Sequence, residues 1–399
     1  MKHNIFKSLI IGAATIALGA CSEGDKFDYD HNVAFIAGTE VTPITKFVVE
    51  DTPSTQMISV STTAPVTADT KVTLAIDPSK VDDYNEAKGT NYFCVPDGSA
   101  VIENPEVTIP AGRSYSDAVV VKMLSTEQFE EGRVYVIPVT IKETGIDVLE
   151  PSRTIYLQIA RVLQFTALDI SNTRMYSNFI FPDNLMKELG AFTYEIKFYS
   201  RQWHRIARMC SFTSKNEENS SMLRFGENGL PERSLQWVSP GGSIVSSTEF
   251  DTDRWYTLSL TYDGSVLTMY VDGNKDAEGA YSGTVDFQRI ELGMSWTSYP
   301  SSQYFNGCIA EMRVWDRALT PGEIKMGICG VDAKSKGLVA YWKLNEGEGH
   351  IFHDATGNGY DMDWSKTCRE INEGAGLTYD LDYSAYVQWN SSDANRCSE

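Results

Sequence analysis

One hairpin near the middle of the chain constrains the fold more than any other segment. Residues 255–262 alternate apolar and polar side chains, and residues 265–271 form a second run rich in β-forming residues. Asp263-Gly264 separates the two runs, and this pair tolerates the positive φ angles of a tight hairpin turn. Residues 192–198 also alternate and predict a half-buried strand. The centre of the chain is therefore predicted to form antiparallel sheets.

Other patterns add short strands and two short helices. Thr320 can cap a helix whose first residue is Pro321, and Glu323 completes a capping box. A second helix is predicted over residues 81–87. Because proline cannot donate to a strand ladder, Pro138 predicts an edge strand or a bulge. The strands predicted in the first part of the chain are 71–76, 118–121, 134–141 and 154–159.

Composition places the chain among folded proteins that do not bind nucleic acid. Hydrophobic residues make up 42% and charged residues 22%, which excludes a disordered chain. The 34 Lys and Arg residues against 54 Asp and Glu residues give a formal net charge of −20. This charge repels phosphates and anionic polymers, so a polymeric ligand is expected to be neutral, such as an uncharged glycan.

The N-terminus is typical of a secretory signal. Lys2 and Lys7 precede or flank an apolar run, residues 9–20, that is too short to span a bilayer of about 30 Å as a helix. The sequence Leu-Gly-Ala-Cys that ends at Cys21 resembles the bacterial lipobox. This resemblance implies that residues 1–20 are a lipoprotein signal peptide and that Cys21 carries the lipid. The alternative is an ordinary secretory peptide.

The residues after the cysteine refine the expected location. Residues 21–32 are acidic and poor in aliphatic side chains, as a flexible tether should be. They resemble the acidic export signal of Bacteroidota surface lipoproteins. The resemblance implies a protein anchored by lipid in the outer membrane and exposed at the cell surface, with the periplasmic face as the alternative.

Six further cysteines follow Cys21. Cys94 stands alone in the first part of the chain and is expected to be a buried thiol. The remaining five allow at most two disulfides and leave the connectivity open. No close pair exists, which argues against a zinc site. These five are Cys210, Cys308, Cys329, Cys368 and Cys397.

Residues 33–163 are predicted to form an immunoglobulin-like sandwich, because many short strands alternate with turn signals. The Asp77-Pro78-Ser79 turn and the closing run Tyr-Val-Ile-Pro-Val at 135–139 resemble an uncharacterised N-terminal domain of Bacteroidota surface lipoproteins. The same domain precedes some family 18 endoglycosidases. The resemblance implies a spacer or docking module.

Residues 165–399 carry a second resemblance. The hairpin with Tyr-Val-Asp-Gly at 270–273, and Phe-Asn-Gly-Cys-Ile-Ala-Glu-Met-Arg-Val-Trp at 305–315, look like the laminin-G and pentraxin group of concanavalin A-like jelly rolls. The Asp-Ala-Thr-Gly-Asn-Gly stretch at 354–359 extends this likeness, although in many relatives such a stretch opens the sandwich. The tail is expected to supply missing strands of the same jelly roll, or else an appended subdomain.

Catalytic motifs of glycosidases are not evident. Glu311 and Asp316 differ in strand parity and should face apart, and Glu195 has no carboxylate partner at the required spacing. His350 and His353 have an odd spacing that places them on opposite faces of a strand. The sequence therefore favours a protein that is not an enzyme, although an unfamiliar active site is not excluded.

A glycan site needs aromatic rings beside hydrogen-bonding groups. Trp203, Trp296, Tyr299 and Tyr304 occupy loop-like segments and are the predicted ligand-binding residues, with packing of the loops on the core as the alternative. The strand residues Trp255, Trp315 and Trp342 are expected to be packing residues.

Many relatives in the concanavalin A-like group bind calcium. Asp354 and Asn358 have the oxygen ligands that a structural calcium ion would use. Turn chemistry explains the same residues.

The sequence thus predicts an all-β protein that binds glycan without catalysis. We expect it to capture a neutral polysaccharide or N-glycan at the outer membrane for a Sus-like transporter and its binding proteins. The alternatives are an adhesin that binds protein and a divergent glycoside hydrolase.

Overall fold

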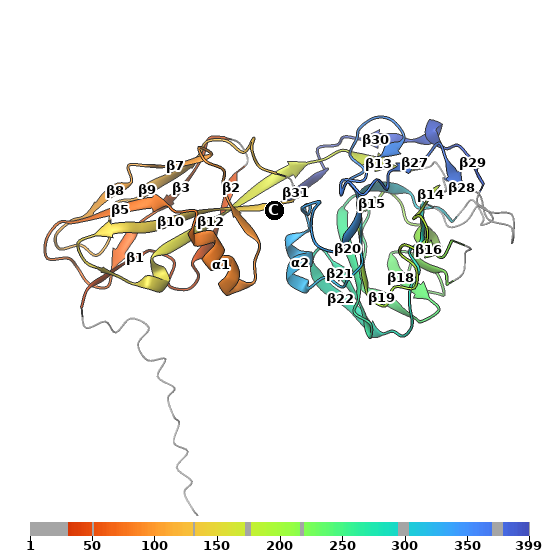
Figure 1. The fold of residues 1–399 in the computed structure, drawn as a ribbon, viewed down its shortest axis with the longest axis horizontal. Coiled ribbons are helices and arrows are strands. Elements are labelled where there is room, and N and C mark those ends of the chain that lie inside the picture. Colours follow the sequence, from red (N-terminus) through yellow and green to blue (C-terminus); the bar gives the residue numbers. More distant parts are fainter. Residues whose placement is uncertain are drawn as a thin grey trace, which may run out of the picture.

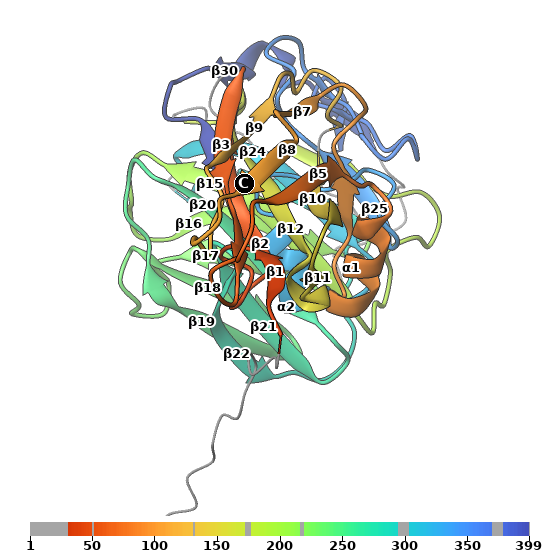
Figure 2. The same cartoon turned by 90° about the vertical axis from the view of Figure 1, so that its left-hand side faces the viewer.

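The chain folds into two β-rich bodies that lie side by side, with the C-terminus between them (Figure 1). The computed structural model describes residues 31–49, 52–130, 132–171, 177–215, 219–293, 303–368 and 378–398. Seen along the long axis, the first body lies in front of the second (Figure 2). The predicted all-β architecture is confirmed. The described part of the chain consists mainly of strands, which two short α-helices accompany.

The first body is a sandwich around one apolar core. Phe47, Ile137 and Leu157 point inward from its larger sheet and pack with Ile58 and Val121 from the facing strands. The larger sheet runs β2 (Ile44–Val49), β12 (Thr154–Gln164), β10 (Val134–Thr144), β5 (Thr70–Ile76), β8 (Glu106–Ile109), with β6 (Tyr92–Cys94) beside β10. The facing strands are β3 (Ser54–Ile58), β9 (Val119–Met123), β7 (Ala100–Glu103), and β11 (Asp147–Val148), β1 (Val33–Ile36), β4 (Val60–Thr62). The helices are α1 (Lys80–Lys88) and η1 (Glu150–Ser152).

β10 is a central strand, so the predicted edge position of Pro138 is wrong. β12 pairs with one side of β10, while β6 and β5 share the other side, β6 up to Val136 and β5 from Val139. The carbonyl of Pro138 accepts from the Asp77 amide on that shared side. The backbone N and O of a strand residue point to the same side of the strand. The N–H that Pro138 lacks would therefore face the junction between β6 and β5.

The second body is a larger sandwich with an aromatic core. Tyr194, Phe212, Trp237 and Phe287 pack together between its two sheets. The eight-stranded sheet runs β22 (Asn274–Ala280), β21 (Val266–Val271), β20 (Trp255–Tyr262), β15 (Phe192–Ser200), β24 (Gly307–Trp315), β13 (Ala167–Asp169), β30 (Gln388–Asn390), with β25 (Leu338–Trp342) beside β24. The six-stranded sheet runs β14 (Ser177–Ile180), β23 (Arg289–Leu292), β16 (Ala207–Thr213), β17 (Ser221–Phe225), β18 (Ser234–Ser239), β19 (Gly242–Glu249). The smaller elements are β26 (Ile351–Phe352), β27 (Met362–Asp363), β28 (Thr367–Cys368), β29 (Tyr379–Leu381), η2 (Ser384–Tyr386) and α2 (Pro321–Met326).

The hairpin forms with a turn one residue longer than predicted, because Ser265 joins Asp263 and Gly264, and of the predicted pair only Gly264 has a positive φ, 99°. The capped helix forms as predicted, whereas β15 is a strand with a different burial. Glu323 N donates to the Thr320 hydroxyl at the start of α2, and its carboxylate accepts from Thr320 N. β15 is buried on both faces instead of one, because Glu195 and Lys197 on its polar face are also buried. The segment after β24 covers this face, since Thr193 in β15 donates its hydroxyl hydrogen to the Arg317 carbonyl.

A final strand, β31 (Arg396–Ser398), returns to the first body and ties the two bodies together. It pairs antiparallel with the end of β12. A disulfide joins Cys329 to Cys397, and Arg133 of the first body forms an ion pair of 3.2 Å with Asp332 of the second. We call β31, this disulfide and this ion pair the clamp.

The other cysteines of the described residues remain thiols. Cys210, Cys308 and Cys368 are buried. Cys94 is half-buried instead of fully buried as predicted, and burial raises its pKa to about 11. Neither α-helix in the described part of the chain has the length and hydrophobicity that a membrane crossing requires.

Candidate functional site

The structure brings two of the predicted ligand-binding loops together. Trp203 packs on Phe225 with ring centroids 4.3 Å apart, and the rings of His204 and Tyr304 lie 5.0 Å apart. All three residues, Trp203, His204 and Tyr304, are half-buried, and we call them the aromatic patch. Trp296 and Tyr299, the other two predicted binding residues, lie outside the described residues. Trp203 is thus packed on the core and partly exposed, and its contact with a ligand stays a prediction.

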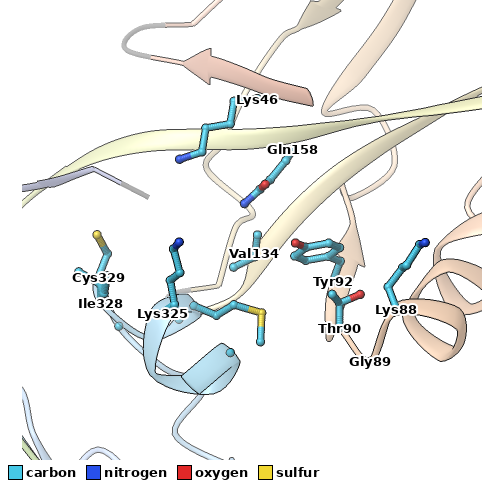
Figure 3. A pocket seen from close by; sticks show the side chains of 14 residues that line it. Lys46, Lys88, Gly89, Thr90, Tyr92, Val134, Gln158, Lys325, Ile328 and Cys329 are labelled. Carbon is cyan, nitrogen blue, oxygen red and sulfur yellow. The ribbon is translucent and has the colours of Figure 1, made fainter. Parts of the chain in front are cut away.

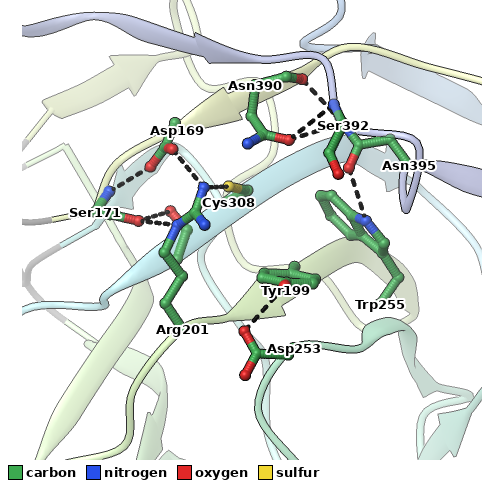
Figure 4. A network of polar contacts seen from close by, with 11 residues as sticks. Asp169, Ser171, Tyr199, Arg201, Asp253, Trp255, Cys308, Asn390, Ser392 and Asn395 are labelled. Atoms are coloured by element: carbon green, nitrogen blue, oxygen red, sulfur yellow. Dashed lines mark hydrogen bonds and ion pairs between the residues drawn. The ribbon is translucent and has the colours of Figure 1, made fainter.

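Arg201 fixes the start of the loop that carries Trp203. Its guanidinium donates to Oδ2 of Asp169, the last residue of β13, at 2.7 Å and to Oγ of Ser171, just after β13, at 2.9 Å (Figure 4). The Arg201 amide donates to the Asn306 carbonyl at 2.9 Å, which joins this loop to the segment that carries Tyr304. The two loops are therefore held against each other by the backbone as well as by their rings.

The end of the same loop rests on the backbone of a turn. Ile206 has a φ of 61°, which is strained for a β-branched residue. Gly226 has a φ of 66°, and a Cβ there would lie 3.0 Å from Glu232 Cα and 3.4 Å from Ile206 N. Glycine is needed at 226 both for its backbone angle and for the close approach of the loop.

Charged side chains on the outer face of the six-stranded sheet lie beside the aromatic patch. Arg208 is 3% exposed, and its Nε donates to Gln303 Oε1 at 2.8 Å, immediately before Tyr304. Glu227 binds Arg224 at 2.6 Å and Arg208 at 3.6 Å. These contacts hold polar groups in place next to aromatic rings. The sequence analysis missed Arg208 and Glu227, although two arginines inside apolar strands were a usable signal.

Two nitrogen atoms of the aromatic patch are buried without a hydrogen-bond partner among the described residues. They are Nε1 of Trp203 and Nε2 of His204. An unpaired buried donor or acceptor costs free energy in the folded protein.

A second polar cluster, on the face of β15 covered by α2, is built as an ion-pair network. Arg313 binds both Glu195, at 3.0 Å, and Glu311, and Lys197 lies 3.6 Å from Glu311. The prediction that Glu195 lacks a carboxylate neighbour is therefore incomplete, since β15 and β24 place Glu311 beside the same guanidinium. Burial acts to raise the pKa of Glu311, but Lys197 and Arg313 outweigh it and lower that pKa. A carboxylate held ionised in this way is poorly suited to donate a proton.

The histidine and tryptophan residues weighed in the sequence have ordinary structural roles. His350 lies 3.8 Å from Asp363, and His353 lies 3.1 Å from Asp361. Trp315 and Trp342 are buried, and the indole of Trp255 donates to Asn395 Oδ1 at 3.1 Å (Figure 4).

Part of the second body matches a known family. Residues 173–325 match the model of the concanavalin A-like lectin/glucanases superfamily. The second body is similar to this superfamily over these residues, and we call it the concanavalin A-like domain. Residues 29–148 match a family model of an N-terminal domain. No curated protein matches the chain.

One solved structure supports the fold, and two others are similar to parts of the chain. A candidate carbohydrate-binding protein from Bacteroides ovatus is 24% identical, with a TM-score of 0.57 over 88% of this chain and 98% of that one. EndoBT-3987 from Bacteroides thetaiotaomicron, solved with a Man5GlcNAc product, is 20% identical over 33% of this chain and 31% of that one, with a TM-score of 0.27. The SAP-like pentraxin of Limulus polyphemus is 13% identical over 55% of this chain and 97% of that one, with a TM-score of 0.33.

The predicted calcium turn of the concanavalin A-like domain does not fit a cation. The carboxylate of Asp354 accepts bonds from the amides of Tyr341, Thr356 and Tyr360 and from the Thr356 hydroxyl. Asn358 donates its amide to the Val339 carbonyl at 2.9 Å. Hydrogens thus point at the oxygens that a metal would need. The described residues contain no group of three or more His, Cys, Asp or Glu placed to hold a metal ion.

Proposed function

We propose that this protein binds glycan without catalysis, through the aromatic patch of its concanavalin A-like domain. The observation that carries the proposal is the joining of Trp203, His204 and Tyr304 beside the fixed polar groups of Arg208 and Gln303. The fold shared with the candidate carbohydrate-binding protein of Bacteroides ovatus supports it.

The chemistry of the aromatic patch suits a sugar. The half-buried rings of the aromatic patch offer flat faces for the C–H groups of a pyranose, beside the polar side chains of Arg208 and Gln303. The net charge of −20 favours a neutral polysaccharide or N-glycan over an acidic polymer. The ion-paired state of Glu195 and Glu311 supports a role without hydrolysis.

We further propose that Cys21 anchors the protein by lipid in the outer membrane, with the binding domain at the cell surface. The support is the lipobox-like motif and the acidic tether after it. In this setting the first body is a spacer, and captured glycan passes to a Sus-like transporter and its binding proteins. Protease treatment of intact cells should cleave the protein if it faces outward and spare it if it faces the periplasm.

A glycan array tests the binding site. The full chain should bind one class of neutral glycan, and Trp203→Ala and Tyr304→Ala should each weaken that binding at least tenfold. Because Trp203 also packs on Phe225, His204→Ala provides a variant that leaves this packing intact. Tyr115→Ala, which changes an exposed tyrosine of the first body, is the matched control and should bind normally.

Four results would contradict the proposal. Absence of binding to any neutral glycan would refute it, and so would normal binding by all three patch variants. Release of reducing sugar from a bound glycan would indicate a glycosidase. Capture of a surface protein that survives enzymatic removal of glycans would indicate an adhesin.

A further inference from the structure

A cavity of about 500 Å³ lies between the two bodies, away from the aromatic patch (Figure 3). Its upper wall is the outer face of the larger sheet in the first body, and its lower wall is the end of α2 with the residues that follow it. Cavities of this volume are typical of small-molecule sites.

The lining of this cavity is basic in a protein that is otherwise acidic. Lys46 from β2, Lys88 from α1 and Lys325 from α2 all line it, and the described lining residues include no Asp or Glu. In the chain as a whole, 54 acidic residues outnumber 34 Lys and Arg residues. Three lysines from three separate elements thus make the lining of the cavity positive, whereas the chain as a whole is negative. A positive lining favours binding of an anion.

The side chains around the lysines complete a polar site. Lys325 points up from α2 toward Lys46, and the amide of Gln158 points into the space between them (Figure 3). Lys46 and Gln158 are neighbours because β2 and β12 pair them in register. The ring of Tyr92 forms a side wall with its hydroxyl toward the same space (Figure 3).

Two of the lysines, the Tyr92 hydroxyl and the Gln158 amide have no partner among the described residues. The described residues offer no ion pair to Lys88 or Lys325 and no hydrogen bond to the Tyr92 hydroxyl or the Gln158 amide. Lys88 and Lys325 stand in the last turns of their helices, where a lysine also complements the helix dipole. The helix dipole accounts for the position of each lysine separately. It does not explain why both lysines line the same cavity.

The clamp fixes both walls of the cavity. Cys329 lines it and is bonded to Cys397, and β12, which carries Gln158, pairs with β31. At one edge the backbones touch, since a Cβ on Gly132 would lie 2.1 Å from the carbonyl carbon of Val331. The disulfide, the strand pairing and this backbone contact all join the two walls of the cavity.

We propose that this cavity binds a small acidic sugar, a monosaccharide unit that carries a carboxylate or sulfate group. Lys46 and Lys325 contact the anionic group, and the ring of Tyr92 with the amide of Gln158 contacts the sugar. The sugar part of this inference rests on the proposed function, whereas the anion part rests on the lysines alone.

Calorimetric titration of the full chain at low ionic strength tests the proposal. Sodium glucuronate and glucose 6-sulfate are the acidic probes, glucose is the neutral probe and inorganic sulfate is the anion alone. We expect at least one acidic sugar to bind ten times more tightly than glucose or sulfate, and to weaken in high salt because screening reduces the attraction. Whichever acidic sugar binds more tightly identifies the anionic group.

Substitutions locate the site. Lys325→Met and Lys46→Met should each weaken binding of that sugar about tenfold, while Lys71→Met, at an exposed lysine of β5, should leave it unchanged. Equal affinity for glucose would overturn the anion part, and equal affinity for sulfate would overturn the sugar part. Unchanged affinity in both cavity variants would overturn the site, even if their thermal stability fell.

The aromatic patch and the cavity between the two bodies can be tested independently. Trp203→Ala should abolish binding of neutral glycan on the array and leave titration with the acidic sugar unchanged. Loss of both activities in Trp203→Ala, with its fold intact, would overturn the separate site.

Discussion

Removing the disulfide of the clamp should lower the free energy of unfolding of the concanavalin A-like domain by about 4 kcal/mol. The perturbation is the double substitution Cys329→Ser and Cys397→Ser, which keeps both side chains small. The bond joins residues that are 68 apart in the chain. Closing a loop of that length in the unfolded chain costs about 15 cal/mol/K of entropy, or about 4 kcal/mol at 25 °C.

The remaining contacts of the C-terminal segment should preserve the native structure when the disulfide is removed. Asn395 still accepts from the Trp255 indole at 3.1 Å, and its carbonyl still accepts from Phe165 N at 3.1 Å. The native fold should therefore survive, with its loss of stability arising in the unfolded state. This is why the entropy of loop closure is the appropriate measure.

Guanidinium unfolding followed by tryptophan fluorescence measures the effect. The midpoint of the concanavalin A-like domain should fall in the double variant and stay unchanged in Cys94→Ser, a control in the first body. A midpoint equal to that of the wild type, with the disulfide verified in the wild type by mass, would refute the reasoning. That result would mean that the disulfide does little to reduce the conformational entropy of the unfolded chain.

Three other perturbations test the remaining features. Arg313→Met leaves two buried carboxylates without their guanidinium and should lower the free energy of unfolding by about 3–5 kcal/mol in urea denaturation. Gly226→Ala should cost about 1–3 kcal/mol and weaken glycan binding, whereas Gly349→Ala, also at positive φ but in open space, should leave binding unchanged. Burial acts to raise the pKa of Asp332, but the Lys334 amide and Arg133 lower it below its ordinary 3.8. The stabilisation from Asp332 should thus be complete above about pH 4 and lost as pH falls through the lowered pKa, so the melting temperatures of wild type and Asp332→Asn should converge in acid.

Features encoded by neighbouring residues could be predicted from the sequence. The capping box of Thr320 and Glu323 depends on contacts three residues apart, and the turn at Asp263-Gly264 depends on local backbone preference. The cap forms as expected and the turn forms with Ser265 as an additional residue, because no distant partner is needed to decide them.

Features decided by distant segments could not be predicted. Pro138 is tolerated in a central strand because β6 and β5 happen to meet beside it. Glu195 is buried because Arg313, far along the chain, neutralises it. In the candidate site, Trp203 and Tyr304 could be chosen from the sequence as loop aromatics, but their meeting and the support from Arg208 depend on the pairing of strands.

The position of β31 has a consequence for how the protein is made. It follows every other strand of the described residues, yet its partner β12 completes the first body. Each sandwich can therefore form as it emerges during synthesis, but the two cannot be locked together until β31 has left the ribosome. The same placement means that a purification tag fused directly after Ser398 would begin at the seam between the bodies.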